Sequence, residues 1–152
     1  MKGIFKMQKG FTLIELLIVI GIIAVLIGVF VANVNLARPF QQARDSQRYA
    51  NVNSIATAAK TRIANYRGSW SQASTAGCAA LPSTATVIGS PSAAGVYNLG
   101  ACLVPTFMTA VPFDPSVGSD ASSGYTIFLR SDGRVNVSAP FYEGDTAISI
   151  IN

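Results

Sequence analysis

An uninterrupted apolar run near the N-terminus constrains this chain more than any other feature. Residues 16–32 (LLIVIGIIAVLIGVFVA) hold no polar side chain, and the wider stretch 11–37 holds one acidic residue, Glu15, and no basic one. A helix of about 20 apolar residues is long enough to cross a hydrocarbon core ~30 Å thick. The run therefore predicts a helix that lies in a membrane or is covered by partner molecules.

The charges before this run predict its orientation. Lys2, Lys6 and Lys9 precede it and no acidic residue does, so residues 1–10 are expected to stay cytoplasmic and the chain after Ala37 to lie outside. The net charge of +4 comes mostly from these lysines, because 8 basic and 7 acidic side chains remain without them. The basic composition is therefore no evidence for a nucleic-acid partner.

Two ordinary interpretations of the N-terminus compete with a more specialised one. A secretory signal has an apolar core of about 7–15 residues and a small-residue cleavage site, whereas this run is longer and residues 32–37 (ANVNLA) offer a weak site. A plain signal anchor fits everything except Glu15. A carboxylate in an apolar span costs roughly a few kcal/mol unless it is paired, and such acids usually mark a function.

A cut after Gly10 would supply the missing partner. Phe11 would then carry a free α-amino group one helical turn from Glu15, and this amine could pair with Glu15 of its own chain or of a neighbour. The same cut would remove the three lysines of the leader. The helix would then be free to leave the bilayer.

The segment KGFTLIE (residues 9–15) with the apolar run after it resembles the leader and N-terminal helix of type IV pilins and pseudopilins. In that family a prepilin peptidase cuts after the Gly and methylates the new N-terminal Phe, and the Glu at mature position five helps to recruit and register subunits. The resemblance implies cleavage after Gly10, N-methylation of Phe11 and an assembly role for Glu15. It covers about residues 2–35, and beyond them only the layout of the chain is similar.

Small residues on the apolar helix indicate how copies pack. Ala24, Gly28 and Ala32 follow one another at four-residue spacing, with Gly21 alongside, and small residues let membrane helices approach closely. The alternative is the ordinary Gly and Ala content of a membrane helix. Many pilins carry a Pro within this helix, whereas the first Pro here is Pro39, so we expect any unwinding in a filament to centre on residues 28–35.

The pattern after residue 38 predicts an amphipathic helix that continues the apolar one. We expect one helix over residues 11–66, kinked just before Pro39. Its predicted core stripe is formed by Tyr49, Val52, Ile55, Ala56, Ala59, Ile63 and Tyr66. The basic residues expected mostly on other faces are Arg44, Arg48, Lys60, Arg62 and Arg67.

An uncharged segment over residues 68–113 predicts an irregular connection, with a short strand near residues 96–99. It is rich in Ser, Thr, Ala and Gly and contains four prolines. Disorder is the alternative, but disordered segments usually carry high net charge. Cys78 and Cys102 lie in this segment, and outside the membrane an even pair favours a disulfide over two free thiols.

The C-terminal part predicts an antiparallel sheet. Residues 125–130 and 134–138 are rich in strand formers and flank the turn Ser131-Asp132-Gly133, and residues 146–151 supply a third strand. A sheet that covers the helix stripe gives an α+β head domain. The expected divisions are a leader (1–10), a transmembrane or filament-core helix (11–37), an amphipathic spine (38–67) and a head (68–152).

Two charged features of the head admit more than one interpretation. Asp114 and Asp120 lie among hydroxyl side chains and offer the oxygen ligands that calcium prefers, but such residues are more often plain turn formers. Residues 38–67 carry six basic side chains and one acid, whereas residues 114–152 carry two basic and five acidic ones. This asymmetry suits contacts between stacked subunits, and a solvated helix face is the alternative.

The sequence favours a structural subunit of a type IV pilus that works by polymerisation. Expected partners are copies of itself, a prepilin peptidase, the inner membrane before assembly and the pilus machinery, with an extracellular filament as final location. A minor pilin or type II secretion pseudopilin is the alternative, and a DNA-uptake pilin with a basic helix is a weaker one. The chain has no His, which removes the commonest general base and metal ligand, so we expect no enzyme activity and no cofactor. Motility and adhesion are properties of the whole machine.

Overall fold

The computed structural model describes residues 10–33, 37–70, 77–89 and 94–152. The chain divides into two compact units, residues 1–36 and residues 37–152. The lysines of the leader lie outside the described residues.

Two helices account for the N-terminal half. Helix α1 spans Leu13–Asn33 and helix α2 spans Ala37–Asn65. Residues 34–36, which join these two helices, lie outside the described residues, so the single helix expected over residues 11–66 stays a prediction. Pro39 falls in the first turn of α2, where a residue without a backbone donor costs no intrahelical hydrogen bond. Residues 28–33 are helical, and the rest of the segment expected to unwind, 34–35, lies outside the described residues.

Four antiparallel strands form one sheet in the order β1-β2-β3-β4. They are β1 (Thr86–Val87), β2 (Thr126–Leu129), β3 (Val135–Ala139) and β4 (Ile148–Ile151). The predicted hairpin is confirmed, with Leu129 opposite Val135. Gly133 adopts a positive φ of 81° in the turn, and its N–H donates to the Arg130 carbonyl.

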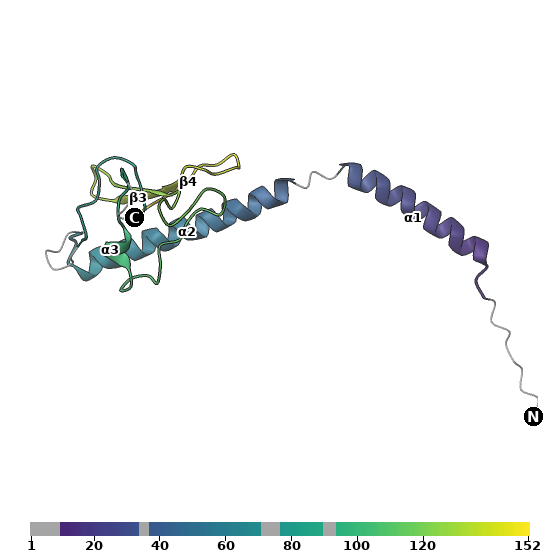
Figure 1. Cartoon of the computed structure of the whole chain (residues 1–152), viewed down its shortest axis with the longest axis horizontal. Helices are drawn as coiled ribbons and strands as arrows, with labels where there is room; N and C mark the ends of the chain where they lie inside the picture. Colours follow the sequence, from purple (N-terminus) through teal and green to yellow (C-terminus); the bar gives the residue numbers. More distant parts are fainter. Residues whose placement is uncertain (1–9, 34–36, 71–76, 90–93) are drawn as a thin grey trace, which may run out of the picture. The chain divides into compact units, whose positions relative to one another are not determined.

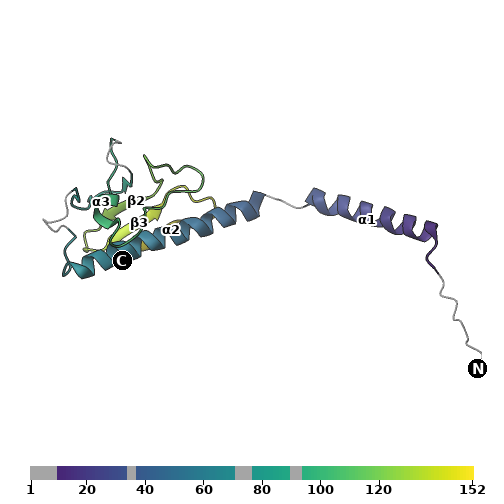
Figure 2. The same cartoon turned by 60° about the horizontal axis from the view of Figure 1, so that its bottom comes forward.

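The sheet lies along α2, as Figures 1 and 2 both show, and the first turns of α2 extend past it. Val52, Ile55 and Ala59 of α2 are fully buried, as are Ile127 and Val137 of the sheet. The α+β architecture expected from the sequence is thus confirmed. The core forms because the helix stripe and one face of the sheet bury their apolar side chains together.

The described parts of the uncharged connection hold only short regular elements, among them the two residues of β1. The short strand expected near residues 96–99 is reduced to an isolated parallel bridge between Tyr97 and Ile88. Helix α3 (Gly100–Leu103), which the sequence analysis did not predict, follows it and buries Cys102 and Leu103.

Candidate functional site

The junction expected to be cut lies in extended, open chain ahead of α1. Gly10 and Phe11 are both outside the helix and exposed, and the Phe11 side chain is 80% exposed. A Cβ added at Gly10 would meet no atom within 4 Å. The packing of the chain itself therefore does not require glycine at position 10, so any such requirement comes from a partner that handles the junction.

Thr12 and Glu15 form a reciprocal cap at the start of α1. The Glu15 N–H donates to Thr12 Oγ1 at 3.3 Å and to the Thr12 carbonyl at 3.1 Å, and Thr12 Oγ1 donates to Glu15 Oε2 at 3.5 Å. The Glu15 N–H to Thr12 Oγ1 bond is one half of the capping box of a Thr-x-x-Glu sequence, while the Glu15 carboxylate contacts the Thr12 hydroxyl instead of its N–H. It directs the Glu15 carboxylate toward the start of the helix, next to Phe11 in the sequence order. The Thr-x-x-Glu spacing signals this contact, although it was not predicted.

Helix α1 is exposed along its length from residue 13 to residue 31 in the part of the chain that the structure describes. Residues 13–31 are long and apolar enough to cross a membrane, and none of them is buried inside the chain. A Cβ added at Gly21 or Gly28 would meet nothing within 4 Å, and Ala24 is exposed, so this face is open to another helix. The side chain of Ala32 lies outside the described residues. An apolar surface of this extent needs lipid or other protein to cover it.

In the head, α2 carries a buried arginine whose burial the sequence analysis did not predict. Arg48 is 0% exposed and donates from Nε to Asp114 Oδ2 at 2.7 Å and from Nη2 to Asp114 Oδ1 at 3.1 Å. Its Nη1 donates to Asp45 at 2.8 Å and to Glu143 at 2.9 Å. Arg44 forms a further ion pair with Glu143. The Arg48 cluster, defined as these five residues, ties α2 to two loops that are distant in sequence.

The pKa values of the Arg48 cluster reflect this pairing. Burial alone would raise the pKa of Asp114, but hydrogen bonds from Arg48 and from Ser116 more than offset it, so the pKa falls to about 2. Glu143 also has a pKa of about 2, because Arg44 and then Arg48 bind its carboxylate. The pKa of Arg48 is raised, chiefly by Asp114. All these groups are therefore charged at neutral pH.

This arrangement bears on the predicted calcium loop. Both oxygens of Asp114 accept hydrogen bonds from Arg48, and Oδ1 also accepts from Ser116 and from the Val117 N–H. Within the described residues no group of three or more His, Cys, Asp or Glu side chains could hold a metal ion. Asp120 is exposed and does not share these contacts. Asp114 thus serves as the counter-ion of an arginine.

A second buried arginine organises the other end of α2. Arg62 is 1% exposed and donates from Nη1 to the Cys102 carbonyl at 2.7 Å and from Nε to the Trp70 carbonyl at 3.2 Å. Its guanidinium also lies 4.8 Å from the ring centre of Tyr66 and 5.3 Å from that of Trp70. The expectation that the basic residues lie mostly on other faces is wrong for Arg48 and Arg62.

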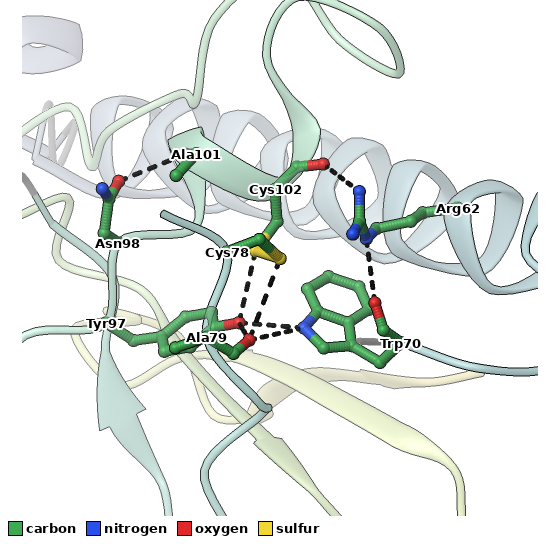
Figure 3. Close-up of a disulfide and its surroundings, with 8 residues drawn as sticks. All are labelled: Arg62, Trp70, Cys78, Ala79, Tyr97, Asn98, Ala101 and Cys102. Carbon is green, nitrogen blue, oxygen red and sulfur yellow. Dashed lines mark hydrogen bonds between the residues drawn. A yellow bond between two sulfur atoms is a disulfide. The ribbon is translucent and has the colours of Figure 1, made fainter. Parts of the chain in front are cut away.

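Cys78 and Cys102 form the expected disulfide, which Figure 3 shows beside Arg62 and Trp70. Trp70 Nε1 donates to Tyr97 Oη at 2.9 Å, and Tyr97 Oη donates to the Ala79 carbonyl at 2.7 Å. The disulfide and these hydrogen bonds hold the uncharged connection against the end of α2.

Charges that looked available for neighbouring subunits are thus partly used within the chain. Arg44 and Arg48 pair with Asp114 and Glu143, and Arg62 is buried. Half of the six basic side chains between residues 38 and 67 are therefore taken up inside the head. The basic surface that a DNA-uptake pilin was expected to present is correspondingly small.

Comparison with known families gives a match at the N-terminus. Residues 5–31 match the model of the prokaryotic N-terminal methylation motif, the prepilin-type signature. The matched segment contains the Gly10–Phe11 junction, the Thr12–Glu15 cap and most of α1. It indicates a protein of the type IV pilin-like or pseudopilin class, and the long apolar helix with a small antiparallel sheet is consistent with a pilin-like fold. No curated protein and no solved structure matches the chain.

Proposed function

We propose that this chain is a structural subunit of a type IV pilus, processed by a prepilin peptidase and polymerised through α1. The proposal rests on the prepilin-type signature at residues 5–31, together with an apolar helix of which the described residues bury no part. The motif and the helix fit insertion in the inner membrane followed by transfer to a filament. Because residues 13–31 are exposed in the part of the chain that the structure describes, packing against copies of itself removes the apolar surface of the helix from water once it leaves the lipid.

The residues at the junction take the following roles in this proposal. The peptidase cuts the exposed bond after Gly10 and methylates Phe11. Glu15, which the Thr12 cap directs toward the helix start, pairs with the amine of Phe11 in its own chain or a neighbour. Gly21, Ala24, Gly28 and Ala32 form the face along which helices approach closely.

We further propose that the chain acts by assembly and catalyses no reaction, with no cofactor. The sequence has no His. Of the buried charged residues, Arg48 and Asp114 pair with each other, and Arg62 binds the carbonyls of Trp70 and Cys102. The head serves as a folded unit that stays outside the filament core.

A minor pilin or a type II secretion pseudopilin shares the same signature, so the decisive experiment measures composition. Filaments sheared from the cell surface are examined by electron microscopy, and their subunits are quantified by mass spectrometry. The proposal predicts that this chain is the main component and that deleting its gene abolishes the filaments. Trace amounts among another subunit would instead identify a minor pilin. Absence from surface filaments together with a loss of secretion on deletion would identify a pseudopilin.

A further inference from the structure

A small polar cleft lies between the start of α2 and the loop that precedes β4. It has a volume of about 270 Å³ and is lined by Arg38, Gln41 and Gln42 on the helix side and by Glu143, Gly144 and Asp145 on the loop side, with Asp45 between them. We refer to it as the α2 cleft. Its walls are held in place because the N–H groups of Glu143 and Gly144 donate to the Asp45 carboxylate at 3.0 and 2.7 Å.

Most charges of the α2 cleft are neutralised by the Arg48 cluster. Asp45 accepts from Arg48, and Glu143 accepts from Arg44 and Arg48. Arg38 and Asp145 differ, because neither side chain has a hydrogen bond or an ion pair with any of the described residues. One cation and one anion therefore face the same cleft from opposite walls, and both are uncompensated.

The position of the cleft along the chain limits what can reach it. The candidate membrane span ends at Val31, and Arg38 follows seven residues later. Seven residues cover at most about 25 Å, and the headgroup layer begins where the hydrocarbon core ends. Phe40, which lies between Arg38 and Gln41 in the sequence and is 65% exposed, adds an apolar ring of the kind that inserts at a membrane interface. While α1 spans a bilayer, connectivity keeps the α2 cleft near the headgroups.

We propose that the α2 cleft binds the headgroup of a phospholipid that carries both a phosphate and a primary ammonium group. The phosphate faces Arg38, whose planar guanidinium fits phosphate oxygens with two parallel hydrogen bonds. The ammonium group faces Asp145 and donates to its carboxylate. Asp45 lies two helical turns beyond Arg38 and binds the residue before Asp145. The phosphate site at Arg38 therefore comes first along α2, and the ammonium site at Asp145 follows. Phosphate and ammonium have the same order in such a headgroup as it leaves the membrane.

This inference rests on the proposed function, because it concerns the stage at which the subunit is still anchored in the membrane. It adds a lipid partner to that stage. The contact holds the head at the membrane surface before assembly and is given up when the subunit is extracted. Binding of this kind distinguishes phosphatidylethanolamine from phosphatidylcholine, whose ammonium has no N–H donor, and from phosphatidylglycerol, which has no cation.

The test uses the full-length chain in a mild detergent, with equal amounts of these three lipids carrying identical acyl chains. Native mass spectrometry measures the fraction of protein that retains each lipid. We expect phosphatidylethanolamine to be retained about fivefold more than either other lipid, as one partly exposed charge pair supports. Asp145→Asn removes this preference, and Arg38→Gln lowers retention of all three lipids. The matched variants Asp120→Asn and Lys60→Gln, which change exposed charges elsewhere, leave it unchanged.

Equal retention of the three lipids by the wild-type chain, or an unchanged preference in Asp145→Asn, would overturn the proposal. The proposal would also be overturned if the wild type retained the lipids without selectivity and both Arg38→Gln and Asp145→Asn weakened chemical cross-linking between copies. That result would assign the two charges to a contact between subunits. Leader cleavage is measured on the same samples. Normal cleavage without lipid selectivity refutes only the lipid site, whereas an uncleaved wild-type chain refutes the proposed function.

Discussion

The pair of Arg48 and Asp114 makes the stability of the head depend on a single buried carboxylate. Asp114→Asn keeps the shape of the side chain but removes its charge and turns one acceptor into a donor that faces the Arg48 guanidinium. The Asp114 side chain is 0% exposed, so water cannot replace the lost interaction. The substitution therefore leaves a buried arginine with a reduced set of partners.

The expected loss follows from two estimates. A pKa lowered from 3.8 to about 2 corresponds to about 2 kcal/mol of stability at neutral pH, and removing one partner of a buried ion pair typically costs about 3–5 kcal/mol. Because Arg48 retains Asp45 and Glu143, we expect Asp114→Asn to lower the free energy of unfolding by about 3 kcal/mol. Domains are commonly stable by about 5–15 kcal/mol, so this is a large fraction.

The pH dependence of this contribution has a defined sign. The folded-state pKa of Asp114 lies below its unfolded value of 3.8, so the stabilisation is complete above pH 3.8 and is lost as the pH falls toward 2. The wild-type free energy of unfolding should therefore decrease between pH 5 and pH 2, as follows from the linkage relation. The decrease should be smaller in Asp114→Asn, which has no carboxylate to protonate at this position.

Urea unfolding of the full chain in detergent, followed by tryptophan fluorescence, measures the effect. Trp70 is the single tryptophan and is 8% exposed, so its emission reports the packing of the head. Asp120→Asn serves as the exposed control. A free energy of unfolding for Asp114→Asn within about 0.5 kcal/mol of the wild-type value would refute the argument. The double variant Arg48→Met with Asp114→Leu should be more stable than Asp114→Asn, because it removes the whole pair.

Three further predictions concern the junction, the helix and the disulfide. Gly10→Ala should leave the precursor uncleaved in intact-mass spectra, whereas the control Gly21→Ala should be processed, because only the junction meets the peptidase. Normal trimming of Gly10→Ala would contradict this. Glu15→Val should insert in the membrane yet give few surface filaments by electron microscopy, whereas a normal yield would remove the pairing role. Replacing Cys78 and Cys102 by Ser should lower the free energy of unfolding by about 3.5 kcal/mol, as expected for a loop closed over a separation of 24 residues, and an unchanged urea midpoint would contradict it.

The sequence predicted those parts of the fold that local patterns determine. The apolar helix, the hairpin around Asp132-Gly133 and the last strand each follow from periodicity or turn chemistry over a few residues. The disulfide was predicted because the two cysteines form an even pair in a segment expected to lie outside the membrane. The cap at Thr12 was also readable from its spacing to Glu15, although it was missed.

The two buried arginines show why the rest could not be predicted. Arg48 and Arg62 are two heptads apart and share one helix face with Val52, Ile55 and Ala59, so periodicity alone places them toward the core. Their charge argued for the opposite face. The partners that reverse this expectation are far away, with Asp114 lying 66 residues and Glu143 lying 95 residues from Arg48. No local sequence pattern predicts ion pairs between residues so far apart along the chain.

The same reasoning explains the exposed Tyr49. It was assigned to the core stripe because of its helical spacing from Val52, yet it is 59% exposed, and the neighbouring Arg48 occupies the buried position. The kink expected just before Pro39 stays a prediction, because residues 34–36 lie outside the described residues. Pro39 itself lies in the first turn of α2.

The central claim is that the chain leaves the membrane as a trimmed subunit and joins other copies through α1. Tandem mass spectrometry of the N-terminus of this chain, taken from filaments sheared off the cell surface, tests it most directly. We predict a chain that begins at Phe11 and carries one added methyl group on its amine. A chain that still begins at Met1, or one that is found only in the membrane and never in filaments, would contradict the account.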